Sequence, residues 1–159
     1  MIPTIERILF LNQIPLFEGF SVDELWQVAQ ALDEMRYDPG EMLVEQGKPG
    51  HALHLIVSGE VVGSVSGKEF VKFGEKAVLG DVAVLDGMPY AMTASAIDEV
   101  VTIKIEREKL DDILNANPGA ARGIIRSLCG KVRYLVEQQL EPAKDKPGDT
   151  KGDLPLLKL

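Results

Sequence analysis

Cysteine is almost absent from this 159-residue chain. Cys129 is the only one, which excludes an intrachain disulfide framework and a metal site built from several thiolates. This usage is typical of a reducing compartment, so we expect a cytoplasmic protein. Cys129 lies in a helical pattern beside apolar residues, which predicts a small buried side chain rather than a reactive nucleophile.

Positive charge and long hydrophobic runs are also scarce. The chain has 17 Lys and Arg against 25 Asp and Glu, a formal net charge of -8. Nucleic-acid binding depends on clustered basic residues, so we expect no nucleic-acid partner. The apolar run from Ile8 to Leu11 is too short for a membrane span or a signal-peptide core, and we expect no membrane insertion.

Catalytic motifs are missing as well. His51 and His54 are three residues apart in a predicted strand, so they point to opposite faces and are poorly placed to bind one metal ion. The glycines match neither a Walker loop nor a nucleophile elbow and are typical of turns. The sequence therefore predicts a non-catalytic chain without a metal site.

What is present is the composition of one folded domain, 45% hydrophobic and 26% charged. Residues 1–36 have a helical period, and the capping pattern of Ser21 and Glu24 predicts a helix from Val22 to Met35. Residues 37–105 change to short runs of Val, Ile and Phe separated by glycines. This change predicts a β region of the sandwich, jelly-roll or small-barrel type.

The helical period returns over residues 106–140, with predicted helices from Glu106 to Leu114 and from Ala120 to Leu140. The second helix carries an apolar stripe that either packs on the β region, the simpler expectation, or pairs with a second copy of the chain. Lys131 is predicted elsewhere on its surface. Residues 141–159 read as a polar linker and a short apolar tail. The stripe comprises Ala121, Ile124, Ile125, Leu128, Val132, Leu135 and Val136.

One segment is similar to a known motif. Leu79 to Ala96, LGDVAVLDGMPYAMTASA, resembles the phosphate-binding cassette of cyclic nucleotide-binding domains, which reads roughly F-G-E-x-A-L-L-x-x-x-P-R-x-A-[ST]-V. Gly80 and Pro89 stand where that motif has Gly and Pro. Three other segments resemble the same family: Pro15 to Phe17, Tyr37 to Glu41, and Leu53 to Val61.

This resemblance covers the chain from about Ile5 to Leu140. It implies an α+β fold, mainly β, in which an eight-stranded, jelly-roll-like β-roll is flanked by N-terminal and C-terminal helices. It also implies a short helix inside the cassette and a C-terminal helix that moves with the ligand. Residues 1–140 are then one cyclic nucleotide-binding-like domain.

Four cassette residues, Gly80, Asp81, Val82 and Ala83, form one half of the candidate ligand site. A short helix beginning here would direct the free backbone N–H groups of Val82 and Ala83 toward an anion. Asp81 stands where the family has the Glu that binds the ribose. Because Asp is one methylene shorter, it either contacts the sugar or, more simply, caps the helix.

Pro89, Tyr90, Ala91 and Thr93 form the other half of the site. Tyr90 replaces the Arg that pairs with the phosphate in the family, and the cassette has no other Lys or Arg. Losing a buried charge partner costs about 2–5 kcal/mol, a factor of about 30 to several thousand in affinity. The Tyr90 ring either fills the emptied site or keeps a role with the ligand. Ala91 and Thr93 stay compatible with a phosphate.

From these residues we expect a non-catalytic regulatory or sensory module with weak or absent binding of cyclic AMP and cyclic GMP and no other cofactor. Two alternatives stay open. One is a ligand-free interaction module that forms a homodimer through the 120–140 helix or docks on a larger effector protein. The other is a sensor of a different small molecule or anion.

Overall fold

The computed structural model describes residues 1–140, and the predicted linker and tail at 141–159 lie outside the described residues. The chain begins with helix α1 (Thr4–Leu11), the 3-10 turn η1 (Pro15–Phe17) and helix α2 (Val22–Ala31). The predicted capping pattern is present at the start of α2, where the Glu24 backbone N–H donates to Ser21 Oγ at 3.2 Å. The Ser21 hydroxyl in turn donates to the Glu24 carboxylate at 3.0 Å.

Helix α2 ends four residues before the predicted end at Met35. Leu32 has an extended backbone, and strand β1 (Asp33–Tyr37) follows directly. Strand β1 pairs antiparallel with strand β8 (Val100–Glu106) along its whole length. The predicted helix end was wrong, and the β region begins at residue 33 rather than 37, because pairing with a distant strand overrides the local helical period.

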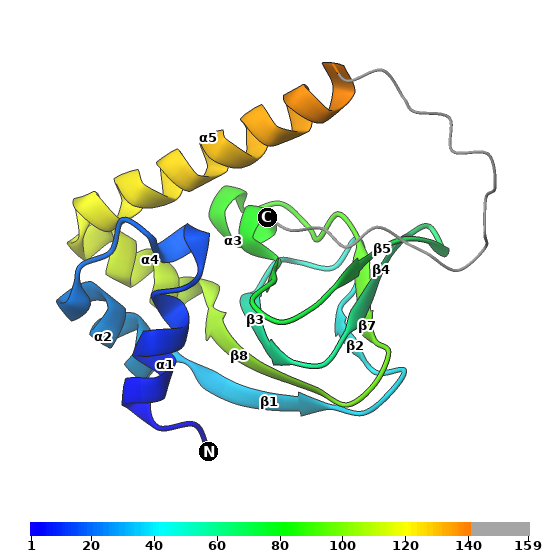
Figure 1. The fold of residues 1–159 in the computed structure, drawn as a ribbon, viewed down its shortest axis with the longest axis horizontal. Helices are drawn as coiled ribbons and strands as arrows, with labels where there is room; N and C mark the ends of the chain where they lie inside the picture. Colours follow the sequence, from blue (N-terminus) through cyan, green and yellow to red (C-terminus); the bar gives the residue numbers. More distant parts are fainter. Residues whose placement is uncertain (141–159) are drawn as a thin grey trace.

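Within residues 1–140, eight strands form two four-stranded antiparallel sheets, in the orders β1-β8-β3-β6 and β2-β7-β4-β5. The sheets face each other as a roll, and α1, α2 and α4 gather at one end of it (Figure 1). This arrangement confirms the predicted fold class, a mainly β roll with flanking helices. The remaining strands are β2 (Met42–Val44), β3 (Ala52–Ser58), β4 (Val61–Val65), β5 (Lys68–Phe73), β6 (Val78–Leu79) and β7 (Thr93–Ala96).

Strands β3 and β8 separate two hydrophobic clusters because successive side chains on a strand point to opposite faces. Leu53 and Leu55 pack toward the N-terminal and C-terminal helices. Ile56 and Val100 pack inside the roll with Phe73 and its neighbours. Strands β3 and β8 are therefore buried on both faces, and they hold the helical layer against the roll.

Three helices complete the described chain: α3 (Asp81–Asp86) inside the cassette, α4 (Arg107–Ala116) and α5 (Pro118–Leu140). Figure 1 shows α5 crossing above α3 and extending toward the β4–β5 hairpin. Among the described residues, no helix combines the length and hydrophobicity needed to traverse a bilayer.

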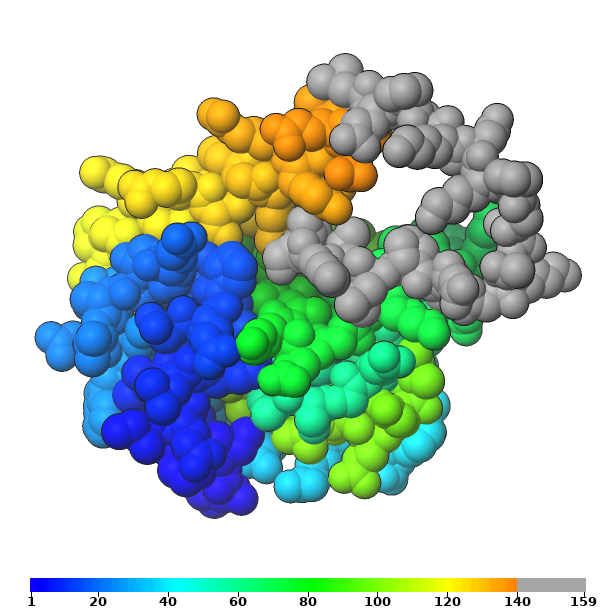
Figure 2. Space-filling view, in the orientation of Figure 1, coloured from blue at the N-terminus to red at the C-terminus, as the bar shows by residue number. Residues whose placement is uncertain are grey.

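Among the described residues, the buried apolar side chains of α5 all lie in its first part. Ala120 and Ile124 are buried, and Gly123 lies directly against Gly19: a Cβ on Gly123 would come 2.9 Å from the Gly19 Cα. The yellow-to-orange surface of α5 follows one edge of the molecule above the blue N-terminal helices (Figure 2).

The second part of α5 does not pack on the roll, which corrects the simpler of the two expectations for its apolar stripe. Val132, Leu135 and Val136 are exposed, as is Ile125 in the first part. Cys129 is also exposed, so the prediction that it is buried was wrong. In both cases the reason is that α5 contacts the domain chiefly near its start.

Candidate functional site

Gly80 opens the cassette in a conformation that favours glycine. Its φ is +81°, and a Cβ there would come 2.8 Å from both the Ala52 carbonyl oxygen and a carbon of the Tyr90 ring. Gly80 is also the N-cap of α3, and within the described part of the chain no side-chain hydrogen bond is made at this cap. The predicted capping role of Asp81 is therefore wrong, because Asp81 is already the first residue inside the helix.

The Asp81 carboxylate is instead paired with a side chain from α5. Lys131 Nζ donates to Asp81 Oδ2 at 2.6 Å, with both side chains mostly buried. Lys131 was predicted on the outer surface of the helix, and its position at the cassette is a correction. Its spacing contained the signal, since Lys131 follows Leu128 by three residues and precedes Leu135 by four, which places it on the apolar stripe.

Tyr90 is held by the backbone of two neighbouring segments. Its hydroxyl donates to the Ala52 carbonyl at 2.8 Å and accepts from the Ala52 N–H at 3.1 Å. Its own backbone N–H donates to Lys48 O, and its carbonyl accepts from Gly47 N, each at 2.9 Å. The ring packs with the hydrophobic cluster inside the roll. The side chain at the arginine position thus joins the cassette to the start of β3.

The other predicted residues of this half differ in their surroundings. Thr93 Oγ1 accepts from the Gln46 backbone N–H at 3.0 Å, so its hydroxyl supports the neighbouring turn. Pro89 lies opposite Pro49 in an isolated antiparallel bridge. Ala91 is exposed.

Two adjoining cavities lie at the cassette. The first, of about 370 Å³, is lined by seven of the eight predicted site residues; Thr93 is not among them. The second, of about 670 Å³, lies between the roll, α3 and α5. The lining residues that both cavities share are Phe70, Gly80, Asp81, Val82, Asp86 and Met92.

The charges around these cavities are mostly negative. Asp81 and Asp86 line both, and Lys131, which lines the larger one, is already paired with Asp81. Within the described residues, no arginine lines either cavity. Among the described residues that line these cavities, an anionic ligand would meet two carboxylates and no free cation.

The two histidines lie in different environments. His51 is exposed and precedes β3, whereas His54 is buried within the strand. Burial, with a smaller contribution from Lys104, lowers the pKa of His54 to about 4. His54 is therefore neutral at physiological pH, and its Nδ1 has no hydrogen-bond partner among the described residues.

An eight-stranded roll with a helix-bearing cassette between β6 and β7 is the architecture of a cyclic nucleotide-binding fold. The family model of the cyclic nucleotide-binding domain matches residues 34–117, and the chain belongs to this family. It is 31% identical over 119 residues to a cAMP-dependent protein kinase regulatory subunit from Colletotrichum orbiculare. That match covers 74% of this chain and 29% of the relative, so the chain spans less than a third of the relative's length.

Solved structures with similar folds include the regulatory subunit of a cAMP-independent protein kinase A from Trypanosoma brucei. The identity is 25% and the TM-score 0.69, covering 86% of this chain and 50% of that chain. A variant of that protein with three substitutions, one of them threonine to arginine, is bound to cAMP in its A site. The catabolite activator protein of Thermus thermophilus shares the fold at 22% identity and a TM-score of 0.67, covering 79% of this chain and 61% of that chain.

Proposed function

We propose that this chain is a non-catalytic regulatory module of the cyclic nucleotide-binding fold that binds cyclic AMP and cyclic GMP weakly or not at all. The observation that carries the proposal is the position of Tyr90. Its ring lies against Gly80 and its hydroxyl is bonded to the backbone of Ala52. Tyr90, at the position of the family's arginine, is thus uncharged, and its hydroxyl is hydrogen-bonded within the chain.

Charge supports the same proposal. A cyclic phosphate needs a cationic partner, and the cation that lines the larger cavity, Lys131, is paired with Asp81. Binding a phosphate would require this pair to open or the phosphate to stay unpaired. We expect an affinity lower than that of an arginine-bearing site by about 30-fold or more, the effect of a lost buried charge partner of about 2 kcal/mol or more.

The Trypanosoma brucei protein offers a parallel. It belongs to a kinase described as cAMP-independent, and the variant of it that is bound to cAMP contains an introduced arginine. By analogy, an arginine at position 90 should supply the cation that the present cassette lacks.

Calorimetry with cyclic AMP and cyclic GMP tests the proposal on the wild type, Tyr90→Arg and Tyr90→Phe. We expect no or very weak binding by the wild type and measurable binding by Tyr90→Arg. Tyr90→Phe is the matched control, because it removes the hydroxyl contacts with Ala52 without adding charge, and it should gain nothing. Micromolar binding by the wild type would contradict the proposal.

The module's output is also proposed, by analogy with a relative of which the match covers 29%. The curated relative is a regulatory subunit of a protein kinase, which supports the view that this domain acts in the cytoplasm as part of, or docked on, a larger effector protein.

The exposed stripe of α5 favours a second candidate function, a homodimerisation module. Ile125 and Val136 are exposed apolar side chains that line neither cavity at the cassette. Sedimentation velocity on the wild type and Ile125→Glu tests it, because a charge in a helix–helix interface should dissociate the dimer. An unchanged monomer in both would remove dimerisation through this helix.

A further inference from the structure

The larger cavity at the cassette, here called the α5 cavity, is walled by apolar side chains from three parts of the chain. Its volume is about 670 Å³, within the range of small-molecule sites. The apolar lining residues from the β5–β6 region are Phe70, Phe73, Ala77 and Val78. Those from α3 are Val82 and Leu85, and those from α5 are Leu128, Val132 and Leu135.

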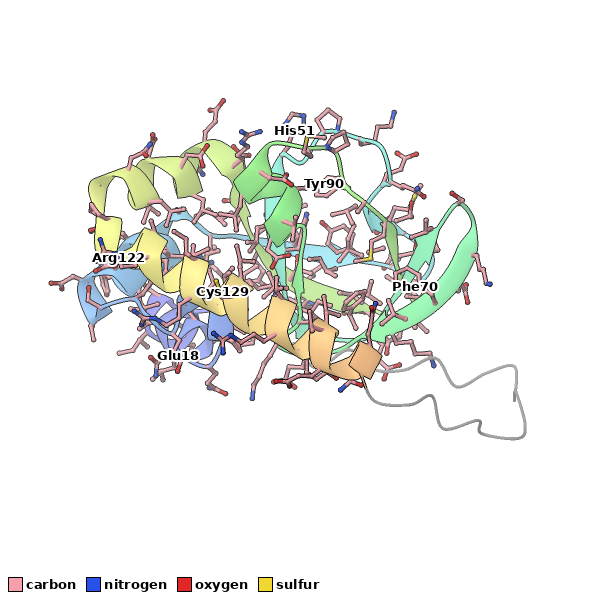
Figure 3. All side chains as sticks on the ribbon, turned by 90° about the horizontal axis from the view of Figure 1, so that it is seen from above. Glu18, His51, Phe70, Tyr90, Arg122 and Cys129 are labelled. Atoms are coloured by element: carbon pink, nitrogen blue, oxygen red, sulfur yellow. The ribbon has the colours of Figure 1, made fainter. Side chains whose placement is uncertain are left out.

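Several of these apolar lining side chains are exposed to solvent. The exposed fraction is 43% for Phe70, 56% for Val82, 60% for Val132 and 51% for Leu135. Figure 3 shows Phe70 on the β4–β5 hairpin, between Tyr90 and the far end of α5. Exposed apolar residues that gather around one cavity mark a binding site more often than residues scattered singly over a surface. An occupant of the α5 cavity would bury these four side chains together.

The charged groups of the cavity disfavour an anionic occupant. Asp81, Asp86 and Lys131 are its charged lining residues, and the first and last of them are joined at 2.6 Å. The remaining Asp86 carboxylate gives the lining a net negative charge. An anion would find no unpaired cation among the described lining residues, whereas an uncharged molecule leaves the Asp81–Lys131 pair intact.

We propose that the α5 cavity binds an uncharged, largely apolar aromatic small molecule, which bridges the cassette and the outer half of α5. This inference rests on the proposed function, because it assumes that no cyclic phosphate occupies the cassette. The proposed ligand class matches the apolar lining of the α5 cavity. Binding would hold Val132 and Leu135 against Phe70 and Val82 and so position α5.

Two fluorescent probes that share one ring system test the charge selection. N-phenyl-1-naphthylamine is neutral, and 8-anilino-1-naphthalenesulfonate is the same skeleton with a sulfonate. We expect the neutral probe to bind the full chain saturably with one site per chain, and the sulfonate to bind at least about tenfold more weakly. Equal or tighter binding of the sulfonate would overturn the proposal.

Two variants of α5 locate the site. Val132→Glu places a charge in the wall of the α5 cavity, whereas Val136→Glu makes the same change four residues on, at an exposed position outside the cavity. Because both positions are exposed, neither change should unfold the domain. We expect Val132→Glu to lower the affinity for the neutral probe at least about tenfold. Val136→Glu should change this affinity by less than about twofold. Equal effects of the two variants would overturn the proposal.

A second copy of the chain is the competing occupant of this face. Sedimentation at the titration concentration should give a monomer for the wild type. A wild-type dimer that excludes the neutral probe and dissociates in Val132→Glu would overturn the proposal. Micromolar binding of cyclic AMP would instead contradict the proposed function, whatever the two probes show, so the two failures are distinguishable.

Discussion

The two halves of α5 differ in how they are held. The first half, from Pro118 to about Gly130, contributes buried Ala120 and Ile124 and touches the N-terminal segment through Gly123. In the second half, Lys131 is partly buried and every described side chain after it is exposed. Hydrophobic packing therefore holds the first half, whereas one ion pair to the cassette restrains the second. The half of α5 that contacts the cassette is therefore the half that contributes least to the stability of the fold.

The largest effect should come from removing the packing of the first half. Ile124→Ala deletes a buried side chain, and we expect it to lower the free energy of unfolding by about 2–4 kcal/mol. Leu135→Ala is the same kind of change in the exposed half and should cost less than about 0.5 kcal/mol. Urea denaturation followed by circular dichroism measures both. Similar losses for the two variants would show that the halves are held alike.

The next effect concerns the glycine contact. In Gly123→Ala the new Cβ would lie 2.9 Å from the Gly19 Cα, so the helix must shift, and we expect a loss of about 1–3 kcal/mol. Gly130→Ala is the control in the same helix, where a Cβ would meet none of the described residues within 4 Å. It should stabilise the protein by up to about 1 kcal/mol through helix propensity alone. A stabilising Gly123→Ala would contradict close packing at Gly19.

The smallest effect should come from the ion pair. Lys131→Met keeps most of the side-chain length but removes the charge from its contact with Asp81, and we expect a loss of about 1–2 kcal/mol. Hydrogen exchange should accelerate at residues 132–140 and remain nearly unchanged at 120–128, because only the outer half depends on this contact. Uniform acceleration along α5 would refute the distinction between the halves.

A double-mutant cycle with Asp81→Asn separates the pair from other consequences of each change. The single variants and the double variant should lose similar stability if the two side chains act mainly on each other. Additive losses would mean that Lys131 and Asp81 act independently.

Local patterns predicted the fold well where local physics decides it. The capping pattern located the start of α2, and the glycine spacing and cassette motif located the roll and α3. The end of α2 was wrong because β1 is specified by its pairing with β8, and nothing within residues 32–37 indicates that partner. A local helical period thus mispredicts the end of a helix where pairing with a distant strand competes with it.

The candidate site shows the same division. The cassette sequence groups Gly80, Asp81 and Tyr90, and all three line the smaller cavity. Lys131 was missed because it comes from a helix 50 residues further along the chain, and its partner is not deducible from the cassette. The burial predicted for Cys129 failed because an apolar stripe indicates which side of a helix is apolar but not how far along its length it is covered.

The contact between Gly19 and Gly123 also gives α5 the geometry of a lever. Two backbones that meet without intervening side chains form a narrow fulcrum, and the 17 residues that follow Gly123, up to Leu140, form the arm. At a rise of about 1.5 Å per residue this arm is about 25 Å long, so a tilt of about 10° at the fulcrum moves its tip by about 4 Å. A displacement too small to disturb the packed half of the helix is thereby amplified at its far end.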